Sequence, residues 1–234
     1  MAKTQSLFIA AVAVVAALVP ATAKSQGILG FDLQATTLSD LPDLAGSVIA
    51  SADQPFSMTF NSGDVISGVL HSSVVRTNSS GTLDFYYQFT NDITSDGALY
   101  YATVASLGMP TLVGYRTDSG GDVNPYQVFS FNTPPNYRLE YVFGAYGFGP
   151  AVEPGESSRV FFFRSNLANY SDNGLATVAG QVPGDDLVIN QFIQSFQPVS
   201  IPEPSTLVLG SAALLTLVVT GRPTAFIRSR SCLI

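Results

Sequence analysis

The sequence contains one cysteine, one histidine and no tryptophan among its 234 residues. One cysteine and one histidine cannot form a disulfide framework, a Cys/His zinc cluster or a two-histidine HExxH site. Charged residues make up only 12% of the chain, about half of the usual share of roughly 25%. Lysine and arginine total 10 against 17 acidic residues, which gives a formal net charge of −7. A nucleic-acid-binding protein needs a basic surface to neutralise phosphates, so nucleic acid is not an expected partner.

Residues 1–23 have the features of a secretory signal peptide. Lys3 supplies a positive charge, Leu7–Val19 is an uninterrupted apolar run of 13 residues, and Ala21 and Ala23 frame an A-x-A cleavage site. As a helix this run measures about 20 Å, which is shorter than a hydrocarbon core of roughly 30 Å. We therefore expect signal peptidase to remove the segment, and an uncleaved N-terminal membrane anchor is the alternative.

The last 34 residues contain three features in a fixed order. A short triplet comes first, an apolar run over residues 207–221 follows it, and three separated arginines come last. The residues of the triplet and the basic end are Pro202, Glu203, Pro204, Arg222, Arg228 and Arg230. Together these features resemble the PEP-CTERM sorting signal, a tail that bacterial exosortases process. The same type of tail also bears the name ice-binding protein C-terminal domain, which describes the tail and implies no ice binding.

Each part of this tail has a physical role. Two prolines remove two backbone donors and keep the chain extended, so a helix cannot run through the triplet. The apolar run suits a transmembrane helix, and the arginines resist translocation. Ser211 and Thr216 interrupt the run, and the helix gains length if Arg222 snorkels and the helix reaches Ile227. The alternatives to a sorting signal are an ordinary tail anchor and a buried core helix.

The body between these ends has the sequence pattern of an all-β fold. Residues 24–201 carry 6 basic and 16 acidic residues, a net charge of −10. Apolar and polar residues alternate over 83–90 and 137–143, as in strands with one buried face. Turn residues separate these runs, and no amphipathic helix pattern of ten or more residues occurs. Further strands are expected at 31–38, 56–60, 65–76, 98–106, 111–116, 126–131, 158–165, 175–179 and 187–196.

This pattern predicts one antiparallel β-sandwich with jelly-roll-like character over residues 24–196. A linker over 197–200 then leads to the sorting signal at 201–234. Pro154-Gly155 suits the central positions of a type II turn. The strand after it carries Phe161, Phe162 and Phe163, too many for an edge strand with one buried face, so we expect it to lie centrally.

Possible catalytic groups are sparse and scattered along the sequence. Residues 118–122 resemble the Asp-Ser-Gly-Gly core of trypsin-like proteases, and His71 precedes them, but the flanking residues and the required framework are missing. A loop is therefore the expected structure there. Glu140, Glu153 and Glu156 could supply a glycosidase carboxylate pair, but they lie on a strand and beside a turn.

The acidic turns at 91–97 and 118–124 lack EF-hand spacing. Asx-turns account for their composition, and no cofactor is expected, although structural calcium stays open. The tyrosine pairs 86–87 and 100–101 should point to opposite faces of their strands, leaving one of each pair at the surface. An exposed tyrosine can stack on a sugar ring.

The sequence as a whole predicts an exported bacterial envelope or extracellular-matrix protein, anchored in the membrane as a precursor and then sorted by exosortase. The body is expected to be structural and non-enzymatic. The resemblance of the tail implies an association with exopolysaccharide or biofilm. The alternatives are a carbohydrate-binding module or adhesin for exopolysaccharide and, less favoured, a secreted hydrolase.

Overall fold

The computed structural model describes residues 28–30, 33–133, 136–144, 149–185 and 188–200. These residues form twelve β-strands and one short 3-10 helix, and none of them forms a helix long and apolar enough to span a membrane. The elements are β1 (Ile28–Gly30), β2 (Gln34–Thr36), η1 (Pro42–Leu44), β3 (Gly46–Thr59), β4 (Val65–Thr77), β5 (Leu83–Asn91), β6 (Ala98–Leu107), β7 (Leu112–Arg116), β8 (Gln127–Thr133), β9 (Asn136–Val142), β10 (Phe161–Ser165), β11 (Asn169–Gln181) and β12 (Ile189–Val199).

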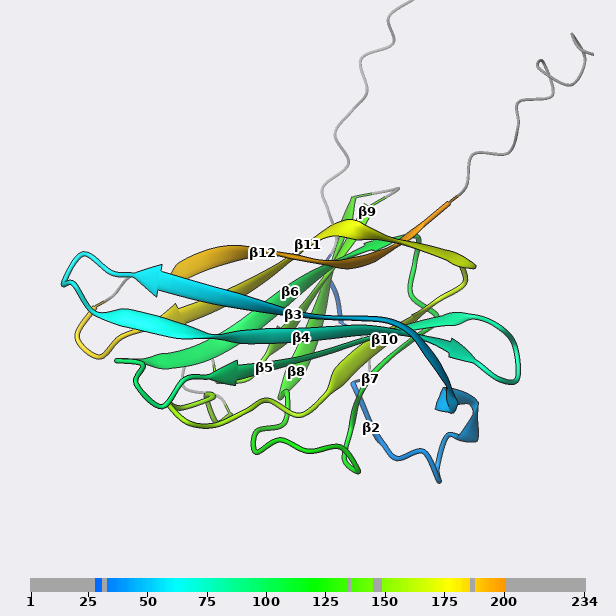
Figure 1. Ribbon diagram of the computed structural model, residues 1–234, viewed down its shortest axis with the longest axis horizontal. Coiled ribbons are helices and arrows are strands. Elements are labelled where there is room, and N and C mark those ends of the chain that lie inside the picture. Colours follow the sequence, from blue (N-terminus) through cyan, green and yellow to red (C-terminus); the bar gives the residue numbers. More distant parts are fainter. Residues whose placement is uncertain (1–27, 31–32, 134–135, 145–148, 186–187, 201–234) are drawn as a thin grey trace, which may run out of the picture.

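The strands form two six-stranded sheets, which confirms the expected all-β, sandwich-like class (Figure 1). Sheet A has the order β1-β8-β9-β6-β11-β12, and sheet B has the order β2-β7-β10-β5-β4-β3. Neighbouring strands are antiparallel except for β2 and β7, which are parallel. Strand β10 lies between β7 and β5, so the central position expected for the three-phenylalanine strand is confirmed.

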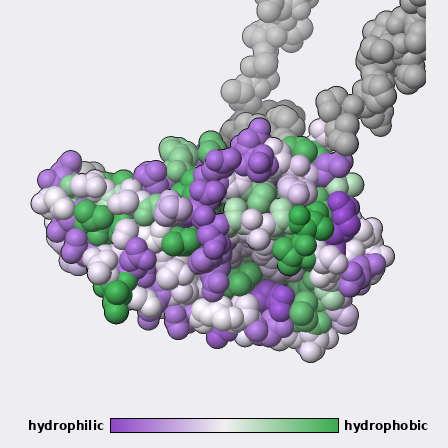
Figure 2. Space-filling model, viewed as in Figure 1, coloured by the Kyte–Doolittle hydropathy of each residue, from purple (hydrophilic) through white to green (hydrophobic). Residues whose placement is uncertain are grey.

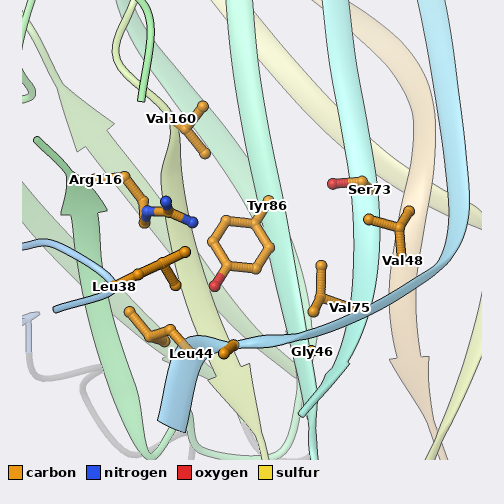
Figure 3. Close-up of a pocket in the computed structure, with 10 residues that line it drawn as sticks. Leu38, Leu44, Gly46, Val48, Ser73, Val75, Tyr86, Arg116 and Val160 are labelled. Carbon is orange, nitrogen blue, oxygen red and sulfur yellow. The ribbon is translucent and has the colours of Figure 1, made fainter. Parts of the chain in front are cut away.

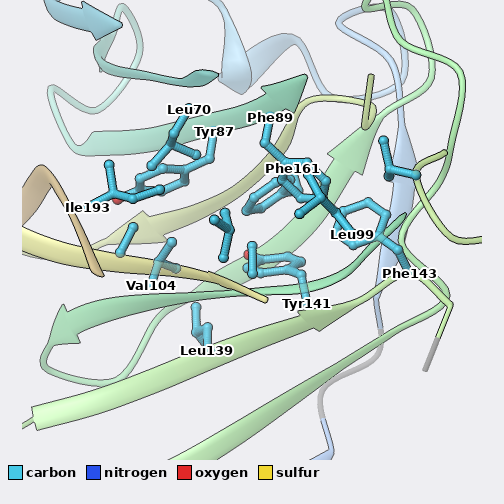
Figure 4. Packing of buried hydrophobic residues seen from close by; sticks show 14 of the residues in the cluster. Leu70, Tyr87, Phe89, Leu99, Val104, Leu139, Tyr141, Phe143, Phe161 and Ile193 are labelled. Carbon is cyan, nitrogen blue, oxygen red and sulfur yellow. The ribbon is translucent and has the colours of Figure 1, made fainter. Parts of the chain in front are cut away.

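The main hydrophobic core lies between the two sheets (Figure 4). Phe161 from β10 contacts Tyr141 from β9 with a ring centroid distance of 4.5 Å, and Phe85 stacks on Phe163 at 5.0 Å. The buried hydroxyl of Tyr87 donates a hydrogen bond of 2.8 Å to the carbonyl oxygen of Phe196, so it has a partner inside the core. All residues of this cluster lie between positions 33 and 196, so the described core is complete without the sorting signal.

A second, smaller cluster lies on the outer face of sheet B. It contains Leu44, Val75, Tyr86 and Phe162, with Leu41, Leu112 and Val160 packed against it. Alternation along β5 and β10 sends Phe161 and Phe163 into the main core and Phe162 to this opposite face. Gly114 lies opposite Phe162, and a Cβ atom there would be 3.1 Å from its ring. The segment that contains η1 therefore covers part of a sheet face that would otherwise be open to solvent.

Several strands differ from the sequence expectations, and strand β1 over Ile28–Gly30 was not expected. Strand β3 starts at Gly46 instead of residue 56, and its first part is mostly exposed, so it lacks the alternation of a half-buried strand. Strand β11 starts at Asn169 instead of residue 175, with a register shift between Ser171 and Gly174. Strand β12 continues to Val199, so most of the expected linker over 197–200 is paired with β11. Pro198 fits there because β12 is an edge strand.

Candidate functional site

The outer face of sheet B carries a concave site that combines polar and aliphatic side chains. Antiparallel register brings outward-facing side chains of neighbouring strands into rows across the sheet, with rows about 7 Å apart. One row contains Ser51, Ser73, Tyr86 and Phe162, and the next contains Asp53, His71 and Gln88.

Two adjoining hollows follow these rows, and together we name them the outer cleft. The first has a volume of about 290 Å³ and the second about 210 Å³. They share Ser73, Tyr86 and Val160, so they form one continuous depression across β4, β5 and the residue before β10. The aliphatic lining of the first hollow is Leu38, Leu44, Val48, Val75 and Val160.

Tyr86 lies at the centre of the outer cleft (Figure 3). Its side chain is 7% exposed, and its ring packs on Phe162 at 5.3 Å. Its hydroxyl lies beside the Arg116 guanidinium but forms no hydrogen bond of normal geometry in the described part of the chain. Burial raises the pKa of Tyr86, and the carboxylate of Asp84 raises it further, whereas the charge of Arg116 and its close approach to the hydroxyl act against both. The hydroxyl is therefore neutral at ordinary pH and able to donate one hydrogen bond and accept others.

Arg116 forms one wall of the outer cleft and is itself fixed by an ion pair. Its Nε donates to Asp118 Oδ1 at 2.6 Å and its Nη2 donates to Asp118 Oδ2 at 2.9 Å. Asp118 also accepts a hydrogen bond of 3.0 Å from the backbone N–H of Leu38. Because Arg116 and Leu38 both line the first hollow, this carboxylate fixes two parts of its lining relative to each other.

The hydrogen bond from Arg116 lowers the pKa of Asp118 to about 2. A lowered folded-state pKa means that the pair stabilises the fold above the ordinary carboxyl pKa of 3.8 and loses this effect as the pH falls towards 2. Asp118→Asn should therefore be less stable than the parent at neutral pH, and the difference should shrink between about pH 4 and pH 2. Urea unfolding of both proteins across this range measures it. A difference that is unchanged at the acid end would show that the charge of Asp118 contributes nothing.

A second ion pair fixes the segment that covers this face. Asp84 is fully buried, and its carboxylate accepts hydrogen bonds of 2.6 Å and 2.9 Å from Nε and Nη2 of Arg164. The same Nη2 donates to the carbonyl oxygen of Asp43 at 2.9 Å. Asp43 belongs to η1, so the pair connects the central strands of sheet B to the element that carries Leu44 into the outer cleft.

The residues of the trypsin-like pattern do not come together. The Nδ1 atom of His71 lies 2.7 Å from a carboxylate oxygen of Asp53, an aspartate that the sequence reasoning did not consider. The hydroxyl of Ser119 donates to the carbonyl oxygen of Arg116 at 2.8 Å, so it stabilises its own loop. Within the described residues, no hydrogen bond joins His71 to a serine, and the arrangement supports a loop at 118–122.

The other carboxylates considered from the sequence are held by local hydrogen bonds or lie on another sheet. Burial raises the pKa of Glu140, which lies on β9 in sheet A. Glu156 accepts a hydrogen bond of 3.0 Å from the backbone N–H of Glu153, across a turn in which Gly155 has a φ of 87°. Asp92 and Asp96 accept hydrogen bonds from Ser67 and from the backbone of Val65. The described residues contain no cluster of three or more metal-ligating side chains.

The tyrosine expectation is wrong for the first pair. Tyr86 and Tyr87 do point to opposite faces, but both are buried, because the η1 segment covers the outer one. Tyr100 and Tyr101 are half-buried. The site residues of the two terminal signals, Ala21, Ala23, Pro202, Glu203, Pro204, Arg222, Arg228 and Arg230, lie outside the described residues.

A further hollow of about 390 Å³ lies on the outer face of sheet A. Phe192 and Leu175 line it and are 64% and 55% exposed. Among the described residues, the buried polar atoms without a partner belong to Tyr86, Asn91 and Ser130, and none of these residues lines this hollow. This hollow therefore offers apolar contact, but it lacks a buried polar atom with free hydrogen-bonding capacity such as the Tyr86 hydroxyl in the outer cleft.

The sequence predicted a sugar contact for the tyrosine pair 86–87 through an exposed ring, whereas the positions of Asp53 and Arg116 in this site were not predicted, because their sequence contexts are those of ordinary strand residues. Alternation could have placed Tyr86 on the face opposite Tyr87, but only strand register shows that it lies beside Ser73 and that Asp53 lies opposite His71. Comparison of the chain with protein-family models, curated proteins and solved structures finds no match.

Proposed function

We propose that the protein is exported to the bacterial envelope, held there by its C-terminal apolar segment, and then cut by exosortase near Pro202-Glu203-Pro204. The observation that carries this proposal is the ordered tail of triplet, apolar run and arginines. The signal-peptide pattern at residues 1–23 supports it, because export is required before a sorting signal can be used. Cleavage transfers the body to the cell surface or the extracellular matrix.

The position of the triplet relative to the fold favours release of an intact body. Strand β12 ends at Val199, so only Ser200 and Ile201 separate the last strand from Pro202. The described core residues all precede this point. A cut near the triplet therefore removes the anchor without removing a core side chain.

A structural, non-enzymatic role is the function that we propose for the body. The support is the dispersion of its reactive groups: His71 pairs with Asp53, Ser119 bonds within its own loop, and Glu140 lies on the other sheet from both. We also propose that the sandwich is jelly-roll-like. Strands β6 and β9 pair in one sheet, strands β5 and β10 pair in the other, and in sequence the first pair lies between the members of the second.

Processing at the triplet can be tested by mass spectrometry of the envelope and medium of a bacterium with an active exosortase. We expect a form that starts at Lys24 and ends between residues 201 and 204. Replacing Pro202, Glu203 and Pro204 together with alanine should leave the full-length tail, including Cys232, attached to the body. Processing should be lost rather than slowed, since the extended backbone depends on both prolines.

The chain offers a matched control in Glu153-Pro154, a second Glu-Pro pair that lies in a body turn. Replacing these two residues with alanine should leave processing unchanged. If only full-length protein is recovered from cells with active exosortase, or if the body is cut equally well without its triplet, the sorting proposal fails.

Recognition of a carbohydrate by the body is the second candidate function. The outer cleft, with its buried unpartnered hydroxyl, is the specific observation that favours it over a purely passive domain. In this candidate function the sugar binds in the outer cleft on sheet B, and not on an exposed tyrosine ring as the sequence suggested.

A further inference from the structure

The hydroxyl of Tyr86 is the feature of the outer cleft that most needs explanation. A buried polar group without a partner costs free energy, and native structures retain few of them. The two other core tyrosines beside it have partners: Tyr87 donates to Phe196 at 2.8 Å, and Tyr141 donates to Phe162 at 2.6 Å. The Tyr86 hydroxyl instead faces the hollow, on the side where Leu44 and Gly46 lie (Figure 3).

Further polar atoms along the outer cleft have unused hydrogen-bonding capacity. The hydroxyl of Ser73 makes no hydrogen bond in the described part of the chain and lies in the same row as Tyr86. Gln88 uses its amide N–H groups on the carbonyls of Gly120 and Ser158, which leaves its Oε1 to accept. The Nδ1 atom of His71 is hydrogen-bonded to Asp53, so its Nε2 atom is the ring nitrogen that can contact a ligand. The cleft thus combines hydroxyl donors with several acceptors.

The charges around the cleft are balanced in pairs. Arg116 is paired with Asp118, Arg164 with Asp84, and the carboxylate of Asp53 lies against His71. Among the described residues that line the two hollows, Arg116 is the only arginine and Asp118 is its partner, and Asp53 is 72% exposed, so its charge is largely solvated at the rim. This electrostatic balance favours a neutral ligand over an anionic one.

The remaining lining is aliphatic, contributed by the leucine and valine side chains of the first hollow. On the face of the molecule seen in Figure 2, hydrophobic residues form small separate groups among hydrophilic ones. No continuous apolar area crosses that face. At about 290 Å³, the first hollow is near the lower limit for small-molecule sites, which suits one ring or two more than a larger ligand.

We propose that the outer cleft binds a neutral sugar residue of a polysaccharide, with the Tyr86 hydroxyl as its central hydrogen-bonding group. A pyranose ring presents hydroxyls that both donate and accept, and C–H groups that pack on aliphatic side chains. Ser73, Gln88 and His71 supply the surrounding contacts. The proposal develops the carbohydrate-binding candidate above and does not depend on sorting, because every residue that it uses lies in the folded body.

The test uses the purified body, residues 24–200, since the described core lies entirely within it. Binding is measured on an array of neutral hexose and pentose oligosaccharides, uronic-acid oligosaccharides and phosphorylated sugars, followed by calorimetric titration of the best neutral oligosaccharide. We expect neutral oligosaccharides to bind in preference to the acidic ones. Tyr86→Phe should weaken that binding about three- to tenfold, the effect of one hydrogen bond.

The thermal midpoint of unfolding separates a binding role of Tyr86 from a structural one. Tyr86→Phe removes a hydroxyl without a partner, so its midpoint should equal or exceed that of the parent. Tyr141→Phe is the matched control: it should lower the midpoint, because Tyr141 loses its bond to the carbonyl oxygen of Phe162, and leave sugar binding unchanged, because Tyr141 does not line the outer cleft. The proposal is overturned if no neutral oligosaccharide binds, if acidic or phosphorylated sugars bind preferentially, or if Tyr86→Phe binds as well as the parent. None of these outcomes bears on cleavage at the triplet.

Discussion

Replacing Phe161 with alanine should lower the free energy of unfolding of the body by about 3–5 kcal/mol, the range for removing a fully buried ring. Its ring contacts Tyr141 at 4.5 Å and both Tyr87 and Phe143 at 5.8 Å. Tyr87 comes from sheet B and Tyr141 from sheet A, so the ring fills the space between the sheets. The neighbours cannot close the cavity without moving one sheet towards the other, which places the expected loss in the upper part of the range. Urea unfolding at equilibrium measures it.

Phe162 is the matched comparison, because it follows Phe161 in the same strand and points to the opposite face. It is also fully buried, but it packs in the smaller cluster beneath the η1 segment. That segment can settle onto the sheet more easily than a sheet can move, so Phe162→Ala should cost about 3 kcal/mol, at the lower end of the range. A loss under about 1 kcal/mol for Phe161→Ala would contradict the packing of β10 between the two sheets.

The contrast between these neighbouring residues shows how far the sequence alone can lead. Alternation of apolar and polar residues predicted the strands that have one face in the core, such as β5 and β9, and the run of three phenylalanines predicted the central position of β10. Both signals come from burial: a strand with one buried face shows alternation in the sequence, and a strand buried on both faces shows a continuous apolar run. Strand β3 leaves little trace in its first part, because it lies at a sheet edge with most side chains exposed on both faces.

The outer cleft could not be predicted for a different reason. Its polar residues come from separate strands, and their proximity depends on register: Asp53 lies opposite His71, and Ser73 lies opposite Tyr86. A shift of one residue in either pair would turn these side chains towards the core. The burial of Tyr86 also depends on η1, a short element that folds back over sheet B through the Arg164 contact to Asp43.

The Asp84–Arg164 pair is the contact on which this arrangement most depends. Arg164→Met should lower the free energy of unfolding by about 3–5 kcal/mol at neutral pH, because it leaves the fully buried carboxylate of Asp84 without its charged partner. The substitution keeps an aliphatic chain of similar length, so lost packing contributes little. Combining it with Asp84→Leu removes both charges, and this double variant should recover most of the loss.

The loss in Arg164→Met should also depend on pH, with a sign that identifies the unpaired carboxylate as its cause. In the parent protein, burial raises the pKa of Asp84 above 3.8, and the hydrogen bond and charge of Arg164 act against that rise. Without Arg164 the folded-state pKa rises further. A buried carboxyl with a raised pKa destabilises the fold above that pKa and is relieved as the pH falls through it, since protonation removes the buried charge.

Arg164→Met should therefore lose less stability at about pH 5 than at about pH 8, whereas the double variant should show no such difference. Urea unfolding of the three proteins at both pH values measures this. The free energy of unfolding of the parent protein, measured at the same two pH values, accounts for all other titrating groups, because the three proteins have these groups in common. An equal loss at both pH values would mean that the Asp84 carboxylate finds another donor or water once Arg164 is absent. In that case the stability that Arg164 provides would come from holding Asp43 and η1 against sheet B, and Leu44 should then become exposed in the single variant.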